Sequence, residues 1–446
     1  MFELDLVLSL PTELSVSIVA KWLPMKYVAV LDSAYCNRTS RVVFLHLLQA
    51  PGCVIPHSFV IVNTAVYQYI ALRKLKVSNL RIRNDIELDL VENVLELSGG
   101  SAEAMTVLDP YVNNSLALYL VAKHCSNLIL LLLDRCVLDF SFRNILQRNI
   151  NIHVLYLRNI AELKASRVPN VKFLCLQILS LERCSFDDAV LTELLRISDG
   201  NLCCLNLTGC SVTLIEVENI GNLCSQLYTL FVKSYSRIGR ALVTVSEKCT
   251  QILDLHVSDV SFRVGDLQRI LTNLLHLEAL QLTRNTSLTN SDLAVLGRRH
   301  GASLLDLSLQ ECAGFNAAGL CEVLRMCPTL TKLYLYTTPE QITPQVIECI
   351  QHTALRSLYI FSYTTDEVKH AIGSYGKRLT HIGLLCSRYD TSELYNNIVR
   401  NCTQLKVFYV LALPADVCDS IRTAYPRIDV HRDTFPPELS YLAGRD

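Results

Sequence analysis

The sequence predicts an α/β solenoid, in which one short strand and one helix repeat along most of the chain. Three observations predict this fold. A frame with apolar residues at its first, fourth and sixth positions recurs twelve times between residues 128 and 405, at intervals of 24 to 27 residues. The stretches between frames carry apolar residues at helical spacing. Of the 446 residues, 50% are hydrophobic and 19% are charged, which excludes a disordered chain.

The frame is clearest in four copies that read Leu-x-x-Leu-x-Leu-x-x-Cys, beginning at Leu128, Leu176, Leu202 and Leu304. In the copy at Leu277, Asn285 replaces the cysteine, and weaker copies begin at Ile152, Leu227, Ile252, Leu330, Leu355, Leu379 and Leu405. Alternate residues of the core face inward as in a strand, and the Cys or Asn turns the chain. A single copy cannot bury its apolar face, so neighbours must stack. This is the pattern of a leucine-rich repeat, and it predicts a horseshoe with a concave sheet and a convex helical rim.

The remainder of each repeat is predicted to be helical. After Asn285, Ser291 is a candidate helix cap, and Leu293 and Leu296 face the core. After Cys184, the residues Leu191, Leu194 and Leu195 have the same spacing.

The 18 cysteines include no Cys-x-x-Cys pair, so the sequence predicts no metal site and no cofactor. Nine lie at two repeat positions, where we expect buried packing: Cys136, Cys184, Cys210 and Cys312 at the turn, and Cys125, Cys224, Cys249, Cys327 and Cys402 three residues before a frame. The acidic N-terminus lacks the features of a secretory signal. Free thiols then favour a reducing compartment, and we expect a cytoplasmic or nuclear protein.

Two segments make the repeats similar to the cysteine-containing leucine-rich-repeat family. The segment 324–333 contains Cys327-Pro328-Thr329-Leu330, which resembles the family's Cys-Pro-x-Leu step. The segment 287–293 resembles its Leu-Thr-Asp-x-x-Leu step. The resemblance covers about residues 120 to 430.

Residues 8 to 48 predict short helices without a repeat frame. Pro11-Thr12-Glu13 is a helix-start signal, an apolar stripe follows (Leu14, Ile18, Val19, Trp22 and Leu23), and Pro24 ends the helix. Two further helices are indicated by Val28, Leu31 and Tyr35, and by Val43, Phe44, Leu47 and Leu48.

The order of residues in this segment resembles an F-box. Its opening Leu-Pro-x-Glu-Leu is matched by residues 10–14, its next apolar positions by Ile18 and Leu23, and its Val-Cys step loosely by Ala34-Tyr35-Cys36. The tryptophan usual after that cysteine is absent. The resemblance implies binding to the Skp-type adaptor of a cullin ligase complex, with contacts at Leu10, Pro11, Leu14 and Ile18. The alternative is an N-terminal cap that seals the solenoid.

Four regions follow from these patterns: 1–50 as the F-box-like helical segment, 51–120 as irregular repeats or a cap, 121–430 as the repeat solenoid, and 431–446 as a C-terminal tail. Within 51–120, one frame fits Leu72, Leu75, Val77 and Leu80, and another is suggested by Leu95 and Leu97. The uncharged stretch Val42–Leu72 is interrupted by Pro51, Gly52 and Pro56. We therefore expect no membrane span.

The concave face of the last repeats is rich in aromatic residues. Six residues are predicted to form one exposed patch that binds a protein substrate: Tyr334, Tyr336, Tyr359, Phe361, His381 and Tyr409. The alternative is that residues 433–437 of the tail cover these rings.

The earlier concave face is mixed in charge, with Arg158, Glu182, Asn206, Thr208, Lys233, Asp254 and His256. The formal net charge is -1, and no basic stripe appears, so we expect no nucleic-acid partner. His256 near Asp254 is the only acid–base candidate, and the motifs of common enzyme classes are absent, so we expect no enzyme. The two resemblances together imply a substrate-recognition subunit of an SCF-type ubiquitin ligase. A repeat scaffold or inhibitor without a ubiquitin role remains the alternative.

Overall fold

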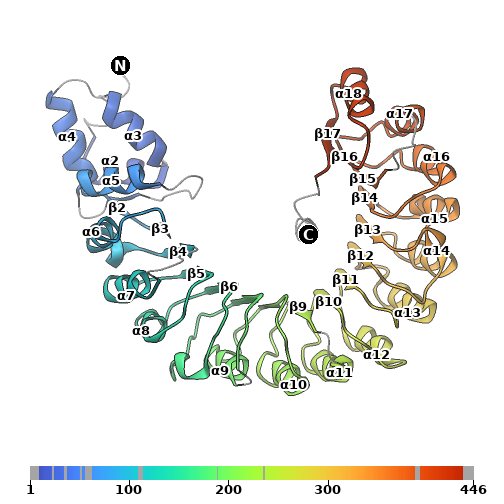
Figure 1. Ribbon diagram of the computed structural model, residues 1–446, viewed down its shortest axis with the longest axis horizontal. Coiled ribbons are helices and arrows are strands. Elements are labelled where there is room, and N and C mark those ends of the chain that lie inside the picture. Colours follow the sequence, from blue (N-terminus) through green and yellow to red (C-terminus); the bar gives the residue numbers. More distant parts are fainter. Residues whose placement is uncertain are drawn as a thin grey trace. The chain divides into compact units, whose positions relative to one another are not determined.

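The computed structural model (Figure 1) describes residues 10–22, 25–34, 38–50, 53–55, 63–108, 114–187, 189–234, 237–386 and 392–434. The chain divides into two compact units, Met1–Cys210 and Ser211–Asp446, called unit 1 and unit 2 below. In each unit strands and helices alternate, and neighbouring strands follow sequence order in a parallel sheet. The chain is therefore a leucine-rich-repeat solenoid of the α/β class, as predicted. Among the described helices, none combines the length and apolar character needed to cross a membrane.

The first described elements of unit 1 are the helices α2 (Thr12–Trp22), α3 (Met25–Ala34) and α4 (Arg38–Leu48). The helix α2 begins directly after Pro11, so the helix-start signal is confirmed. The expected helix break at Pro24 and the loosely matched Tyr35 and Cys36 lie outside the described residues.

One buried carboxylate joins these helices to the repeats. The Asp32 side chain of α3 is 3% exposed. It accepts hydrogen bonds from Arg41 Nε of α4 at 3.1 Å and from Arg73 Nε at 2.8 Å. The hydroxyl of Tyr69 donates a third at 3.3 Å. Arg73 and Tyr69 belong to α5 (Thr64–Arg73), so this network, called the Asp32 network below, links α3, α4 and α5. Beside it, β1 (Val54–Ile55) pairs in parallel with β2 (Lys76–Val77).

The remaining elements of unit 1 are the repeats, in which α6, α7 and α8 lie on one side of the strands β3 to β6 (Figure 1). In chain order they are β3 (Asn79–Arg83), α6 (Leu88–Ser98), η1 (Gly99–Ser101), β4 (Ala104–Leu108), α7 (Asn114–His124), β5 (Leu130–Asp134), α8 (Phe140–Arg148), β6 (Val154–Arg158), η2 (Ala165–Arg167), β7 (Ile178–Glu182), α9 (Val190–Ile197) and β8 (Cys204–Leu207).

Regular repeats begin earlier than the leucine frame indicates. The strand β3 pairs in parallel with β4, and β4 pairs with β5, so both continue the same sheet. Residues 79–108 therefore belong to the regular repeats, within the region 51–120 where the sequence suggested irregular repeats or a cap. Leu95 and Leu97 do not form a frame, because both lie on α6. The true frame positions of β4 are Ala102, Met105 and Val107, all of them buried.

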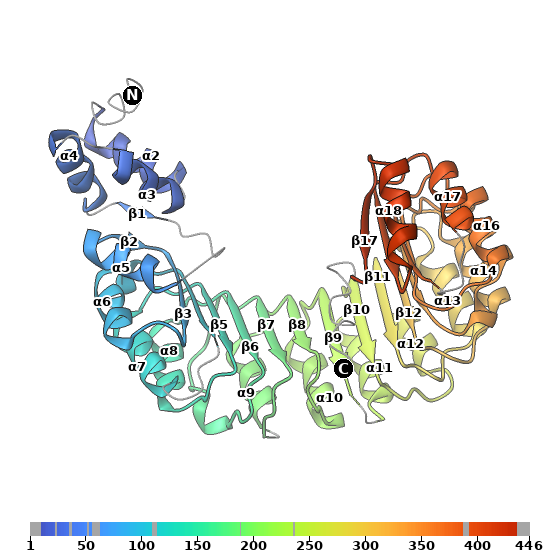
Figure 2. The same cartoon turned by 45° about the horizontal axis from the view of Figure 1, so that its top comes forward.

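Unit 2 continues the pattern, and Figure 2 shows its strands side by side with helices covering one face. Its elements are α10 (Leu214–Leu223), β9 (Thr229–Lys233), α11 (Gly239–Lys248), β10 (Asp254–Ser258), α12 (Asp266–Asn273), β11 (Ala279–Thr283), α13 (Asn290–His300), β12 (Asp306–Gln310), α14 (Ala317–Met326), β13 (Lys332–Tyr336), η3 (Pro339–Gln341), α15 (Pro344–Cys349), η4 (Ile350–His352), β14 (Ser357–Ile360), α16 (Asp366–Tyr375), β15 (His381–Leu385), α17 (Ser392–Asn401), β16 (Val407–Leu411), α18 (Ala415–Ala424) and β17 (Asp429–Arg432).

The helix α13 corrects one cap assignment. Thr289, not Ser291, is the N-cap. The Thr289 hydroxyl accepts from the backbone N–H of Asp292, and the Asp292 carboxylate accepts from the Thr289 N–H at 2.8 Å. The acidic residue three positions after Thr289 completes a reciprocal capping box, which Ser291 cannot form.

The strand ends share a turn that the cysteines stabilise. The seventh residue after several frame starts adopts a left-handed conformation with φ between 50° and 61°: Arg135, Asn159, Arg183, Asp259, Arg284 and Glu311. The next residue turns inward, and the thiol of Cys184 donates to Leu157 O of the preceding repeat at 3.2 Å. All nine predicted cysteines are buried. Burial raises the pKa of Cys249 to about 11 and of Cys327 to about 12, so these thiols stay protonated and packed.

Candidate functional site

The predicted adaptor contacts lie on or just before α2. Leu14 is 49% exposed, Pro11 is exposed, and Leu10 and Ile18 are half-buried. The opposite side of α2 faces inward, where Ser15 and Val19 are each 1% exposed. The sequence interpretation thus names residues on the accessible side of α2, which leaves their apolar surface available to a partner.

The adjacent helices also expose apolar residues. Tyr27 and Val30 of α3 are 53% and 55% exposed, and Val42 and Val43 of α4 are 53% and 46% exposed. The sequence analysis identified none of these four residues as surface candidates, and it placed Val43 in the buried apolar stripe of its helix. With Leu14 they form the set called the N-terminal apolar surface below.

The aromatic residues of unit 2 form a packed cluster. Tyr334, Tyr359, Phe361 and Tyr409 pack together, and Tyr336 lies against them. The rings of Tyr334 and Tyr359 stack with centroids 4.7 Å apart and an interplanar angle of 5°. The centroid of Tyr359 lies 6.2 Å from that of Phe361 and 6.1 Å from that of Tyr409. This group is called the aromatic cluster below.

A glycine makes room for this stacking. Tyr334, Tyr359, Gly383 and Tyr409 occupy one row across β13 to β16. A Cβ on Gly383 would lie 2.5 Å from Cδ1 of Tyr359, a distance that real structures do not show. Because Gly383 has no side chain, the Tyr359 ring can lie close to the backbone of β15.

The expectation that these rings lie on an exposed face is wrong for four of them. Tyr334 is 5% exposed, Tyr359 2%, Phe361 5% and Tyr409 9%. Tyr336 and His381 are half-buried, and His381 makes a 3.0 Å hydrogen bond with the Thr380 hydroxyl. Residues 435–437 of the proposed cover lie outside the described residues. A substrate-binding role for the six residues stays a prediction.

The sequence missed one ring at this site. His431 of β17 stacks on Tyr409 with centroids 4.8 Å apart. In the register of β16 and β17, buried Val430 (5% exposed) takes the place of Phe408, and His431 takes the place of Tyr409. Extending the frame by one repeat with Val430 at its fourth position, where leucine is absent, would have identified His431.

The sheet face of unit 1 is polar and open by comparison. A cavity of about 450 Å³ lies on it, lined by Arg81, Thr106, Leu108, Leu132, Asp134, Tyr156, Leu157, Arg158, Ser180 and Glu182. Most of these side chains come from two aligned rows across β3 to β7. The guanidinium of Arg158 lies 3.5 Å from the Glu182 carboxylate. Charges of both signs line this face, as predicted.

The acid–base candidate in unit 2 is a simple ion pair. His256 Nε2 lies 2.6 Å from Asp254 Oδ1, and both side chains are about one-quarter to one-third exposed (25% and 32%). The His256 ring packs on Phe231 with centroids 4.1 Å apart. Asp259 nearby is paired with Lys233 and Arg284.

Comparisons with known proteins give structural likenesses only. No protein family matches the chain, and no curated protein matches it in sequence. Among solved structures, a complex of Rad7 and Elc1 from yeast is similar over 96% of this chain and 89% of the other, with 11% identity and a TM-score of 0.41. A TLR13–ssRNA13 complex is similar over 80% of this chain and 57% of the other, with 14% identity and a TM-score of 0.38.

Proposed function

We propose that this protein is a substrate-recognition subunit of an SCF-type ubiquitin ligase. The N-terminal helices would bind a Skp-type adaptor, and the repeats would hold a protein substrate on the sheet face. The chain itself would carry out no chemistry and would need no cofactor. Its effect would be to raise the effective concentration of substrate lysines near the charged ubiquitin enzyme of the cullin complex.

The observation that carries this proposal is the N-terminal apolar surface. A helical cap that only seals a solenoid needs a polar outer face for solubility. The helices α2, α3 and α4 instead expose Leu14, Tyr27, Val30, Val42 and Val43. We infer that these side chains form one contiguous patch, which is typical of a protein-binding surface. The order of residues 10–14, which resembles the F-box opening, supports an adaptor as the partner.

The Asp32 network supports the same function. A recognition subunit must hold its substrate in a defined direction from its adaptor, which requires a rigid link between the two binding parts. Asp32 supplies such a link, because its carboxylate binds one side chain of α4 and two of α5. We infer that this network fixes the N-terminal helices on the first repeats.

The test is capture of the full chain by a purified Skp-type adaptor. Leu14→Glu places a charge on the N-terminal apolar surface without disturbing the core, because Leu14 is 49% exposed. We expect a loss of about tenfold or more in affinity, the size expected of an interface hot spot. Leu72→Glu is the matched control, since Leu72 is 78% exposed on α5 and outside this surface.

Two outcomes would contradict the proposal. Equal capture of Leu14→Glu and wild type, together with equal capture of the double variant Leu10→Ala and Pro11→Ala, would mean that the adaptor docks elsewhere. No capture of the folded wild-type chain would favour the alternative, a leucine-rich-repeat scaffold or inhibitor without a ubiquitin role. The same apolar surface would then serve a different protein partner.

A further inference from the structure

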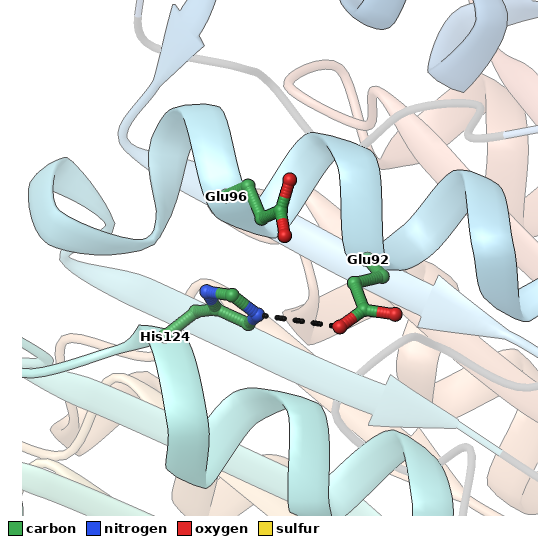
Figure 3. Close-up of side chains that lie close together, drawn as sticks. All are labelled: Glu92, Glu96 and His124. Atoms are coloured by element: carbon green, nitrogen blue, oxygen red, sulfur yellow. Dashed lines mark ion pairs between the residues drawn. The ribbon is translucent and has the colours of Figure 1, made fainter.

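Three side chains with metal-binding chemistry meet on the helical side of unit 1. Glu92 and Glu96 lie one turn apart on α6, so both carboxylates project from the same face of that helix. His124 is the last residue of α7, the next helix in the chain. Figure 3 shows all three side chains pointing into the space between the two helices. Their candidate ligand atoms all lie within 4.8 Å of one another.

This cluster has unmet interactions. His124 Nε2 is buried and has no hydrogen-bond partner. Glu92 Oε1 lies 3.8 Å from this nitrogen, which is too far for a hydrogen bond. Leaving a buried polar atom unsatisfied is costly. A cation between the three groups would give His124 Nε2 a partner and would be bound by both carboxylates.

We propose that Glu92, Glu96 and His124 bind a divalent transition-metal ion of the zinc type. Nitrogen and carboxylate ligands lie about 2.0–2.2 Å from zinc, so two ligand atoms on one ion are about 3–3.5 Å apart. Small rotations of side chains that are exposed or half-buried would bring the present atoms to that spacing. The imidazole nitrogen favours zinc and its neighbours in the first transition row over magnesium or calcium, which prefer oxygen ligands. Three protein ligands leave a fourth position for water, and the ion would clip α6 to α7.

The position of Lys123 leads to a specific prediction about metal binding at this site. Its ammonium lies 2.7 Å from Glu92 Oε1, the same oxygen that faces His124. Lys123 and the metal ion would compete for that oxygen. Removing the ammonium should therefore tighten metal binding, whereas removing a ligand should weaken it.

The experiment is calorimetric titration of the full reduced chain with ZnCl₂. We expect one site in the wild-type chain, an affinity about tenfold or more weaker in Glu96→Gln and His124→Asn, and a tighter site in Lys123→Met. Glu96 is exposed, so its variant tests the site without risk to folding. Glu87→Gln is the matched control, because Glu87 is exposed beside the same helix and makes no cap hydrogen bond.

The comparison between variants separates this site from the thiols. Zinc bound by half-buried cysteines such as Cys203 would appear equally in every variant. Identical titrations of wild type and Glu96→Gln would therefore overturn the proposal, as would absence of zinc binding by the wild type. Magnesium and calcium titrations of the wild-type chain should show no binding at this site, and equal affinity for calcium would refute the assignment of ligand type.

Discussion

Asp32→Ala should destabilise the attachment of the N-terminal helices to the repeats. The substitution removes three hydrogen bonds at once and leaves the guanidinium groups of Arg41 and Arg73 without their shared partner. Removing one partner of a fully buried ion pair costs about 3–5 kcal/mol. Here the two arginine side chains are 41% and 29% exposed, so water can solvate them in part. We therefore expect a loss of about 2–3 kcal/mol.

The assay is hydrogen exchange of the full chain, combined with equilibrium urea unfolding. The amides of α3 and α4 should exchange faster in Asp32→Ala, whereas those of β10 to β12, which lie in unit 2, should not change. Asp85→Ala is the control, because its ion pair with Arg83 is 47% and 46% exposed and should contribute less than about 1 kcal/mol. Equal exchange of α3 and α4 in the Asp32 variant and the wild type would refute the reasoning.

Two further predictions concern buried rings. Tyr359→Ala should lower the free energy of unfolding by about 3–5 kcal/mol, because it empties the centre of the aromatic cluster. The control Tyr363→Ala, at a residue that is 65% exposed, should change this free energy by less than about 0.5 kcal/mol. If urea unfolding gave the two variants equal stability, Tyr359 would not be a core residue. Burial of His300 lowers its pKa in the folded chain below 6.5, so the unfolded state binds more protons than the folded state below that pH. The stability contributed by neutral His300 is therefore present above pH 6.5 and lost as the pH falls below it. In His300→Gln the amide can still donate to Leu271 O, and this variant should lose less stability between pH 7.5 and 5.5 than the wild type. The control His352→Gln, at an exposed position, should lose as much stability as the wild type. An unchanged dependence of stability on pH in His300→Gln would contradict this account.

The repeat architecture could be predicted because leucine spacing and strand geometry have a common cause. Each strand buries alternate side chains, and Leu131 and Leu133 of β5 are fully buried as the frame requires. The same geometry explains why the frame of β4 was not recognised in the sequence. The buried slots accept any apolar side chain of suitable size, and Ala102, Met105 and Val107 occupy them without matching a leucine pattern. The sequence therefore identifies the strands best where leucine itself is used.

The candidate site was harder to predict, because sequence periodicity assigns a side chain to a face but does not say whether that face is covered. Tyr359 and Tyr156 both occupy the fifth position of their frames, yet Tyr359 is 2% exposed and Tyr156 is half-buried. Gly383 contributes to this difference by giving the Tyr359 ring space over the neighbouring strand. The Glu92, Glu96 and His124 cluster was missed for a similar reason. Glu92 and His124 are 32 residues apart, and only the packing of α6 beside α7 brings them together.

Burial also decides what binding at the aromatic cluster would require. A partner gains little from rings that are 2% to 9% exposed, so binding there must be accompanied by a rearrangement that uncovers them. The cost of that rearrangement reduces the apparent affinity, and a substitution such as Tyr359→Ala would change stability and binding together. The polar sheet face of unit 1 carries no such cost, because Tyr156 is half-buried and Arg158 is exposed beside an open cavity. A rigid protein partner would therefore contact the face of unit 1 in its present conformation, whereas the aromatic cluster would bind only a partner whose affinity exceeds the cost of uncovering it.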